Sequence, residues 1–309
     1  MALNIRFWLP VAALAFAAVA AAREEKLCTQ TAQAGRIACE NDGRDTLWTT
    51  VAICTNLSDA GARRTCKVAA KQAERDGRQE CSEIQKARQE LCNAVGQGAY
   101  DPDLNPSRFV TPAAAAANPN PYLRLVPGFV RVYQGGGEQV TVTVTNRTKV
   151  IAGVTCTVVI DTVLETGSQL REDTEDYFAQ DVAGNVWYFG EFVKNYENGE
   201  LVDLDGSFLS GTNGAKAGVA MKAAPVVGET YRQEFAFGEA EDVGEVMSIT
   251  GAATVPAAAC TNTCLITRDF TPVEPGHEEN KYFLAGIGEI LSINLETGAR
   301  TELVSVTVP

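Results

Sequence analysis

The segment Cys54-Thr55-Asn56-Leu57-Ser58-Asp59-Ala60-Gly61-Ala62-Arg63-Arg64-Thr65-Cys66 lies at the centre of a symmetric array of cysteines. Six cysteines occupy the N-terminal third of the chain, and their successive separations of 11, 15, 12, 15 and 11 residues form a palindrome. In an antiparallel helical hairpin, residues that face each other have numbers that add up to a constant. Pairing the cysteines from the outside inward meets this condition. The spacing therefore predicts a hairpin that turns near residue 60, with the disulfides Cys28–Cys92, Cys39–Cys81 and Cys54–Cys66.

Helical spacing and capping support this hairpin. Separations of 11 and 15 residues are close to three and four helical turns, so the cysteines of one arm stay near one face. Ser58 and Asp59 are both suited to cap the second helix. Two helices bury little apolar surface by themselves, which explains a need for covalent bridges. The alternative is a compact bundle of three or four helices, broken at Gly43 and Gly77 and paired differently.

Residues 1–22 have the composition of a signal peptide. Arg6 supplies a positive n-region, an apolar stretch follows, and its last residues are small enough for cleavage. A membrane anchor is the alternative, but the apolar stretch is short for a bilayer span. The first cysteine, Cys28, comes too late to accept a lipid directly after cleavage. We therefore expect a secreted or periplasmic protein with no membrane span after signal cleavage, in a compartment where cysteines form disulfides.

The rest of the chain divides by composition into three segments. Residues 23–98 contain no proline and are rich in helix formers, whereas residues 99–128 are rich in proline and alanine and read as a linker that partly packs. Residues 129–309 have the texture of an antiparallel β domain. Residues 23–99 hold 12 basic and 11 acidic side chains, and residues 100–309 hold 13 basic and 28 acidic ones. The acidity therefore belongs to the β domain and argues against a nucleic-acid partner.

The β domain reads as a meander of short strands. Alternating apolar and polar residues indicate strands such as Val154–Glu165, Gln169–Gln180 and Gly288–Asn294. Tight turns such as Asn198-Gly199 join them, so neighbours in the chain are expected to pair. Residues 210–228 form the longest stretch without regular texture. The predicted fold class is α+β in two parts: a disulfide-stapled antiparallel helical hairpin, then an all-β antiparallel meander that forms a curved or barrel-like sheet.

Motifs between residues 100 and 290 carry a family resemblance. They are Tyr100-Asp101-Pro102, Asn120-Pro121-Tyr122, Val126-Pro127-Gly128, Ala179-Gln180-Asp181, Gly184-Asn185-Val186-Trp187-Tyr188-Phe189-Gly190-Glu191, and Val227-Gly228 followed by Tyr231-Arg232-Gln233-Glu234. This segment resembles an uncharacterised family of secreted bacterial proteins, some of which share a cysteine-bearing helical segment. Arg124 and Arg131 depart from the pattern, which has a proline and an aromatic residue there. The resemblance implies export and the fold but no activity. More loosely, the meander is similar to periplasmic lipoprotein-like sheets that cradle apolar ligands.

The densest group of carboxylates is Glu172, Asp173, Glu175 and Asp176. On a strand, Glu172 and Asp176 share one face, and Asp173 and Glu175 share the other. These four residues are the candidate metal ligands, for calcium, and the group also contains a candidate acid–base pair. The alternative is a solvated edge strand whose charges oppose aggregation. Apart from calcium at this place, we expect no cofactor.

The strongest aromatic group is Trp187, Tyr188, Phe189 and Phe192. Alternation sends Trp187 and Phe189 to one face and Tyr188 to the other. These four residues are the candidate ligand-binding residues, because ligand pockets are mostly apolar with a few polar groups. Ordinary packing in a core is the alternative.

Three cysteines and one histidine remain. We predict a disulfide Cys156–Cys264 that ties two strands and leaves Cys260 over, and a tight Cys260–Cys264 loop is the alternative. His277, the single histidine, follows a proline and a glycine and is read as a surface residue beside glutamates. With one histidine, most metal sites and most nucleophile–base pairs are excluded.

Three functions are compatible with these features. The first is an exported, non-enzymatic binding or interaction protein, in which a helical rod presents an acidic β domain to a protein, to the cell envelope or to a small apolar ligand. The second is a secreted hydrolase, for example glycan-directed, that uses paired carboxylates of the β domain. The third is a calcium-dependent adhesion or envelope component.

Overall fold

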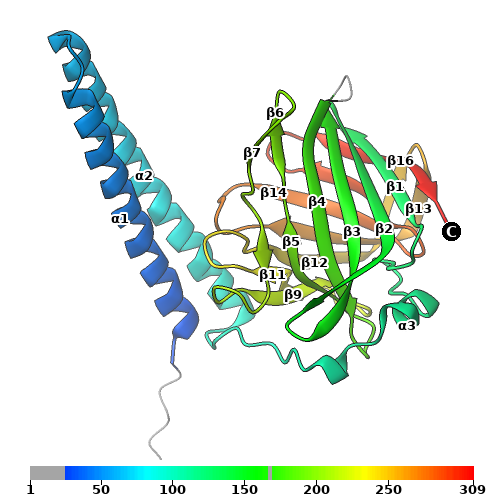
Figure 1. Cartoon of the computed structure of the whole chain (residues 1–309). Coiled ribbons are helices and arrows are strands. Elements are labelled where there is room, and N and C mark those ends of the chain that lie inside the picture. The colour runs from blue at the N-terminus through cyan, green and yellow to red at the C-terminus, as the bar shows by residue number, and fades with distance from the viewer. Residues whose placement is uncertain (1–24, 166–168) are drawn as a thin grey trace, which may run out of the picture.

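The computed structural model of the chain describes residues 25–165 and 169–309. The predicted signal peptide, residues 1–22, lies outside the described residues. Two long antiparallel helices project from a curved, nearly barrel-shaped sheet (Figure 1). The predicted fold class, α+β in two parts, is confirmed.

The hairpin consists of α1 (Leu27–Thr55) and α2 (Ala60–Val95). Asp59 caps α2, because its carboxylate accepts a hydrogen bond of 2.7 Å from the backbone N–H of Ala62. The turn therefore lies just before residue 60. Both helices run unbroken past Gly43 and Gly77, so the alternative of a shorter-helix bundle is wrong. The three disulfides are the predicted ones: Cys28–Cys92, Cys39–Cys81 and Cys54–Cys66.

The strands that follow the hairpin form one antiparallel sheet. They are β1 (Val130–Gly135), β2 (Glu138–Ile151), β3 (Val154–Glu165), β4 (Gln169–Gln180), β5 (Val186–Phe192), β6 (Asn195–Glu197), β7 (Glu200–Asp203), β8 (Phe208–Leu209), β9 (Lys216–Met221), β10 (Thr230–Arg232), β11 (Glu234–Phe235), β12 (Val243–Val255), β13 (Ala258–Phe270), β14 (Glu278–Leu284), β15 (Gly288–Asn294) and β16 (Arg300–Thr307). Their order is β10-β12-β13-β14-β15-β16-β1-β2-β3-β4-β5-β9-β11, with β6, β7 and β8 to the side.

The two ends of this order are consecutive in the chain. Gln233 alone separates β10, which pairs with β12, from β11, which pairs with β9. The segment Thr230–Phe235 therefore connects both edges and curls the sheet into a barrel. One strand of this closure was not expected: β9 lies inside residues 210–228, where the sequence suggested no regular structure, and it pairs with both β5 and β11. The sequence does not indicate this strand, because β9 is short and its alanines and glycine give no clear alternation of apolar and polar residues.

Residues 99–128 pack onto the barrel. They contain a 3₁₀ turn, η1 (Pro106–Arg108), and a short helix, α3 (Pro112–Ala117). Phe109 covers the outer face of β5, with its ring 5.2 Å from that of Phe189. Further along, Leu125 is fully buried in the barrel core. The segment thus covers one outer face and enters one end of the barrel.

The predicted disulfide Cys156–Cys264 is wrong. Cys264 is bonded to Cys260 of the same strand, β13, and Cys156 is a buried free thiol in β3. Five strands separate β3 from β13 in the sheet, and the two cysteines belong to different apolar clusters. Irregular register between β12 and β13 brings Cys260 and Cys264 within reach of each other. Burial raises the pKa of the Cys156 thiol to about 12, so it remains protonated.

Four disulfides indicate an oxidising setting, extracellular or periplasmic. Within the described residues, no helix has the length and apolar character needed to cross a membrane.

A buried ion pair joins the hairpin to the barrel. The guanidinium of Arg88 in α2 binds the carboxylate of Glu241 through two hydrogen bonds of 3.0 and 2.5 Å. Both side chains are almost fully buried. The approach is close, since a Cβ on Gly35 of α1 would lie 2.5 Å from the ring of Phe237. Glycine at this position lets the helix reach the barrel.

We expect Glu241→Gln to weaken this junction by about 3–5 kcal/mol, because it leaves the Arg88 charge buried without a carboxylate. Thermal unfolding and hydrogen exchange of the residues around Gly35 measure the loss. Glu239→Gln, an exposed neighbour, is the matched control and should change neither. The double variant Arg88→Met/Glu241→Gln should recover part of the loss. Equal stability of Glu241→Gln and wild type would contradict the role of the pair.

Candidate functional site

The barrel encloses a cavity of about 490 Å³. Its wall is unusually rich in charge for a protein interior. The acidic residues are Asp161, Asp176, Glu191, Glu234, Asp242, Asp269, Glu279 and Glu289, and the basic ones are Arg124, Arg131 and Lys281. Carboxylates thus outnumber cations in the wall.

The cavity has an apolar end and a polar end. In β3 the inward residues change from Val159 to Asp161, and in the antiparallel β4 they change from Phe178 to Asp176. Across the barrel, β14 changes in the same sense from Phe283 to Lys281. Because these strands alternate in direction, the apolar residues lie toward one end of the cavity and the charged residues toward the other. The change comes one residue pair earlier in β4 than in β3, since Val159 pairs with Asp176. The apolar end continues into the core around Leu125.

A β-bulge in β5 turns Glu191 into the cavity. The register pairs Tyr188 with Phe178 and Glu191 with Asp176, so β5 has one residue more than β4 between these pairs. Gly190 occupies the bulge with a φ of 136°, and a Cβ there would lie 2.2 Å from the carbonyl oxygen of Phe208. The hydroxyl of Tyr188 donates a hydrogen bond of 2.6 Å to Asp176 Oδ1. Tyr188, Asp176 and Glu191 therefore form one cluster.

Burial raises the pKa values of the cavity carboxyls. It raises the pKa of Asp161 to about 8, with Asp176 and Glu172 adding to the shift and Arg131 opposing it. The pKa of Glu191 rises to about 8 and that of Asp176 to about 6, again mainly by burial. Burial, helped by Asp242 and Glu191, also raises the pKa of Glu234 well above its usual value. These groups hold protons at pH values where exposed carboxyls have lost them.

Two of these carboxyls have unsatisfied atoms. Asp161 Oδ1 and Glu234 Oε2 are buried with no hydrogen-bond partner among the described residues. By contrast, Asp269 accepts a hydrogen bond of 3.0 Å from Gln233 and lies 3.4 Å from the ammonium of Lys281. The cavity wall therefore contains an internal pair around Asp269, open acceptors at Asp161 and Glu234, and open Nε donors at Arg124 and Arg131.

The structure separates the four predicted metal ligands. Asp176 lines the cavity and Glu172 lies on the same face of β4, where it accepts a hydrogen bond of 2.7 Å from Thr174. Asp173 and Glu175 lie on the outer face, where they bind Lys194 (2.6 Å) and Arg147. The four carboxylates do not converge on one ion. Within residues 25–165 and 169–309, no group of three or more His, Cys, Asp and Glu side chains is arranged to hold a metal.

The predicted aromatic residues are also divided between the faces. Tyr188 reaches the cavity, where its ring stacks on that of Phe178 at 4.7 Å. Trp187 and Phe189 pack outward against Phe109, and Trp187 donates a hydrogen bond of 2.9 Å to Asp181. Phe192 is 38% exposed and lies outside the cavity. One of the four candidates therefore belongs to the site.

The sequence reasoning missed most of the cavity residues. Asp161 has a signal, because it shares a strand face with Val159 and thus interrupts an apolar face. Glu191 has none, because simple alternation places it opposite Tyr188 and only the bulge reverses this. Glu234 and Lys281 lie inside because the barrel closes, which no local pattern reveals.

Searches with the sequence and the structure find no matching protein family, no matching curated protein and no matching solved structure.

The raised pKa values predict a pH-dependent stability. An unfolded carboxyl titrates near pH 4, whereas folded Asp161 holds its proton to about pH 8. The stabilisation is therefore fully present below about pH 4 and lost as the pH rises through 8. Asp161→Asn, which mimics the protonated acid, should match wild type at low pH and exceed it by up to about 5 kcal/mol at pH 9.

Urea unfolding between pH 4 and pH 9 measures this difference. Asp173→Asn is the control, because Asp173 faces outward and its pair with Lys194 is partly exposed. An unchanged dependence on pH in Asp161→Asn would contradict the assignment.

Proposed function

We propose that this chain is an exported, non-enzymatic binding protein whose barrel holds a small molecule with an apolar body and a cationic head. One observation carries the proposal: Asp161, Asp176, Glu191 and Glu234 gather at one end of the cavity, and no Lys or Arg of the described residues forms an ion pair with them. The cavity volume, about 490 Å³, lies in the range of small-molecule sites.

An amine suits both ends of this cavity. Its ammonium group would supply donors to the open acceptors of Asp161 and Glu234, and its apolar body would lie against Leu125 and Met221. A purely apolar ligand, the type first expected, leaves those acceptors unpartnered. A cation also favours the charged form of each carboxyl, so binding at neutral pH is expected to release protons.

The helical hairpin supports the interaction part of the proposal. Its far half carries four exposed large apolar side chains: Trp48 is 69% exposed, Val68 66%, Ile53 62% and Leu57 38%. The tip projects away from the barrel (Figure 1). Large apolar side chains on a projecting arm are available to contact a protein or the cell envelope.

The binding proposal is tested with two probes of one chain length, n-octylamine and 1-octanol. Calorimetry at pH 7.5 in two buffers should show amine binding with proton release and at least 10-fold weaker binding of the alcohol, because a charged hydrogen bond is worth about 1.5–3 kcal/mol. Glu191→Gln should weaken amine binding, and the exposed Glu197→Gln should not. Equal affinity for amine and alcohol would refute a cationic ligand.

A second candidate, a retaining glycoside hydrolase, is favoured by the pair Asp176 and Glu191. Residues directly opposed across two strands have Cβ atoms about 4.5–5.5 Å apart, near the spacing of retaining carboxylates. Glu191, with a pKa of about 8, would serve as the acid and Asp176, with a pKa of about 6, as the nucleophile.

A panel of 4-nitrophenyl glycosides separates the two candidates. The binding proposal expects no release of nitrophenol above the uncatalysed rate. Turnover by wild type that both Asp176→Asn and Glu191→Gln abolish would instead establish the hydrolase, since each carboxyl is required for its step.

A further inference from the structure

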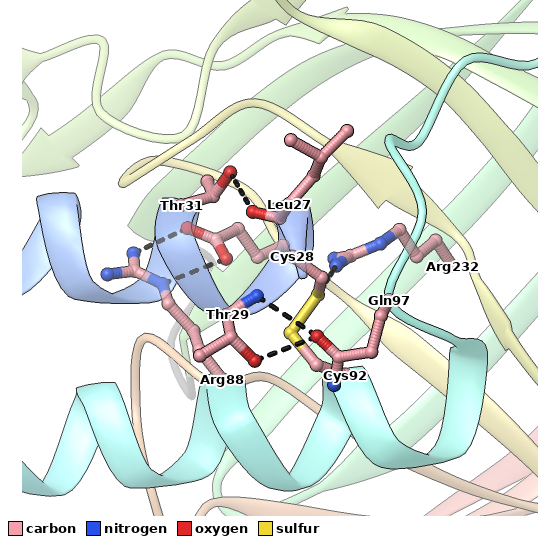
Figure 2. Close-up of a disulfide and its surroundings, with 9 residues drawn as sticks. Leu27, Cys28, Thr29, Thr31, Arg88, Cys92, Gln97 and Arg232 are labelled. Carbon is pink, nitrogen blue, oxygen red and sulfur yellow. Dashed lines mark hydrogen bonds and ion pairs between the residues drawn. A yellow bond between two sulfur atoms is a disulfide. The ribbon is translucent and has the colours of Figure 1, made fainter. Parts of the chain in front are cut away.

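A second cavity, of about 700 Å³, lies at the junction of the hairpin and the barrel. The base of the hairpin contributes Leu27, Arg88 and Val95 to its wall, and the barrel contributes Arg232 and Phe237. The disulfide Cys28–Cys92 also forms part of the wall, and Figure 2 shows Arg232 directed toward it. The cavity lies outside the barrel and is separate from the site described above.

Arg232 is a buried cation that forms no ion pair with any residue that the structure describes. The residue is 8% exposed, and its Nε and Nη1 atoms have no hydrogen-bond partner among the described residues. Nη2 has only the Cys28 sulfur, at 3.9 Å. The guanidinium lies 4.9 Å from the ring centre of Phe235 and 5.6 Å from that of Tyr100. Such ring contacts attract a cation but leave its N–H donors unsatisfied.

The neighbouring charges are already paired. Arg88 holds Glu241 through two hydrogen bonds, and Lys216 lies 2.7 Å from Asp101. Lys222 pairs with Glu229. Of the charged residues in the wall, Arg88, Lys216, Lys222 and Arg232 are basic and Glu241 alone is acidic. The wall is therefore positive within an otherwise acidic domain.

We propose that this junction cavity binds an organic monoanion, a carboxylate head on an apolar body, with Arg232 as its ion-pair partner. A buried guanidinium with free donors is stabilised by an anion that returns the interactions lost with water. The apolar walls around Leu27, Val95 and Phe237 suit a hydrocarbon body, and the volume far exceeds that of a bare inorganic ion.

The electrostatics of Arg232 agree with this assignment. Burial lowers the pKa of its guanidinium, and the nearby charge of Arg88 lowers it further, while Glu241 and Tyr100 oppose the shift. An anion in the cavity would act in the same sense as Glu241 and favour the charged form.

The two sites use opposite sides of one strand. Arg232 faces the hairpin, whereas the next residue along, Gln233, lines the barrel cavity beside Glu234. In the barrel cavity carboxyls outnumber cations and Asp161 and Glu234 offer open acceptors beside the open Nε atoms of Arg124 and Arg131, whereas in the junction cavity the open charged group is the Arg232 guanidinium. Ligands of opposite charge are therefore expected at the two places, and failure of the amine test would leave the junction proposal standing.

Calorimetry on the disulfide-bonded chain at pH 7.5 tests the proposal with octanoate, 1-octanol and inorganic phosphate. Octanoate should bind with a stoichiometry of one and at least 10-fold more tightly than either other probe. Binding of octanol as tight as that of octanoate would show that charge plays no part and would overturn the proposal. Phosphate binding as tight as octanoate would overturn the organic class. The three probes are compared on the wild-type protein, so the result does not depend on whether a variant folds.

Substitutions then locate the site. Arg232→Met, which keeps the apolar stem and removes the charge, should weaken octanoate binding at least 10-fold, and Arg232→Lys should retain part of it. Arg300→Met, an exposed position on β16, removes the same charge and should bind like wild type. Circular dichroism and disulfide mapping confirm that each variant is folded. Full octanoate affinity in folded Arg232→Met would overturn the assignment.

Discussion

The closing strand, residues 230–235, is the constraint on which the rest of the structure depends. It pairs with β12 through β10 and with β9 through β11, so it joins the two edges of the sheet. Closure removes the exposed edges that an open antiparallel sheet would offer to other chains. It also creates an inside, because a curved sheet encloses a cavity only when its ends meet. Without this strand, the carboxyls of the wall would face water and have ordinary chemistry.

The closed barrel places charge where water cannot easily satisfy it. An isolated carboxylate is costly to bury, and these groups respond by holding their protons. Asp269 and Lys281 show the other solution, an internal ion pair. The same reasoning applies on the outside of the closing strand, where Arg88 pairs with Glu241 but Arg232 pairs with no carboxylate of the described part of the chain. If these buried charged groups served stability alone, we would expect each of them to have an ion-pair partner or to be replaced by an apolar residue.

The hairpin could be predicted from the sequence in detail, and the site could not, for physical reasons. A two-helix hairpin is local, so the index symmetry of Cys28 and Cys92 already contains its geometry. The strands Val154–Glu165 and Gln169–Gln180 follow from alternation, which is also local. The bulge at Gly190 reverses that alternation, and Cys260 bonds to Cys264 because of an irregular register. Both depend on neighbouring strands, and barrel closure depends on residues far apart in the chain.

The disulfides explain how the hairpin can be an arm at all. A pair of helices has no interior in which to bury large side chains, and Trp48, Ile53 and Val68 remain exposed. Cross-links that restrict the unfolded chain replace the missing core, each by about 2–4 kcal/mol. Since the stability of the arm does not depend on burying its apolar side chains, those side chains are free to contact other surfaces. The bridge nearest the barrel, Cys28–Cys92, has a second effect, because it holds the base of both helices against the closing strand and so completes the wall around Arg232.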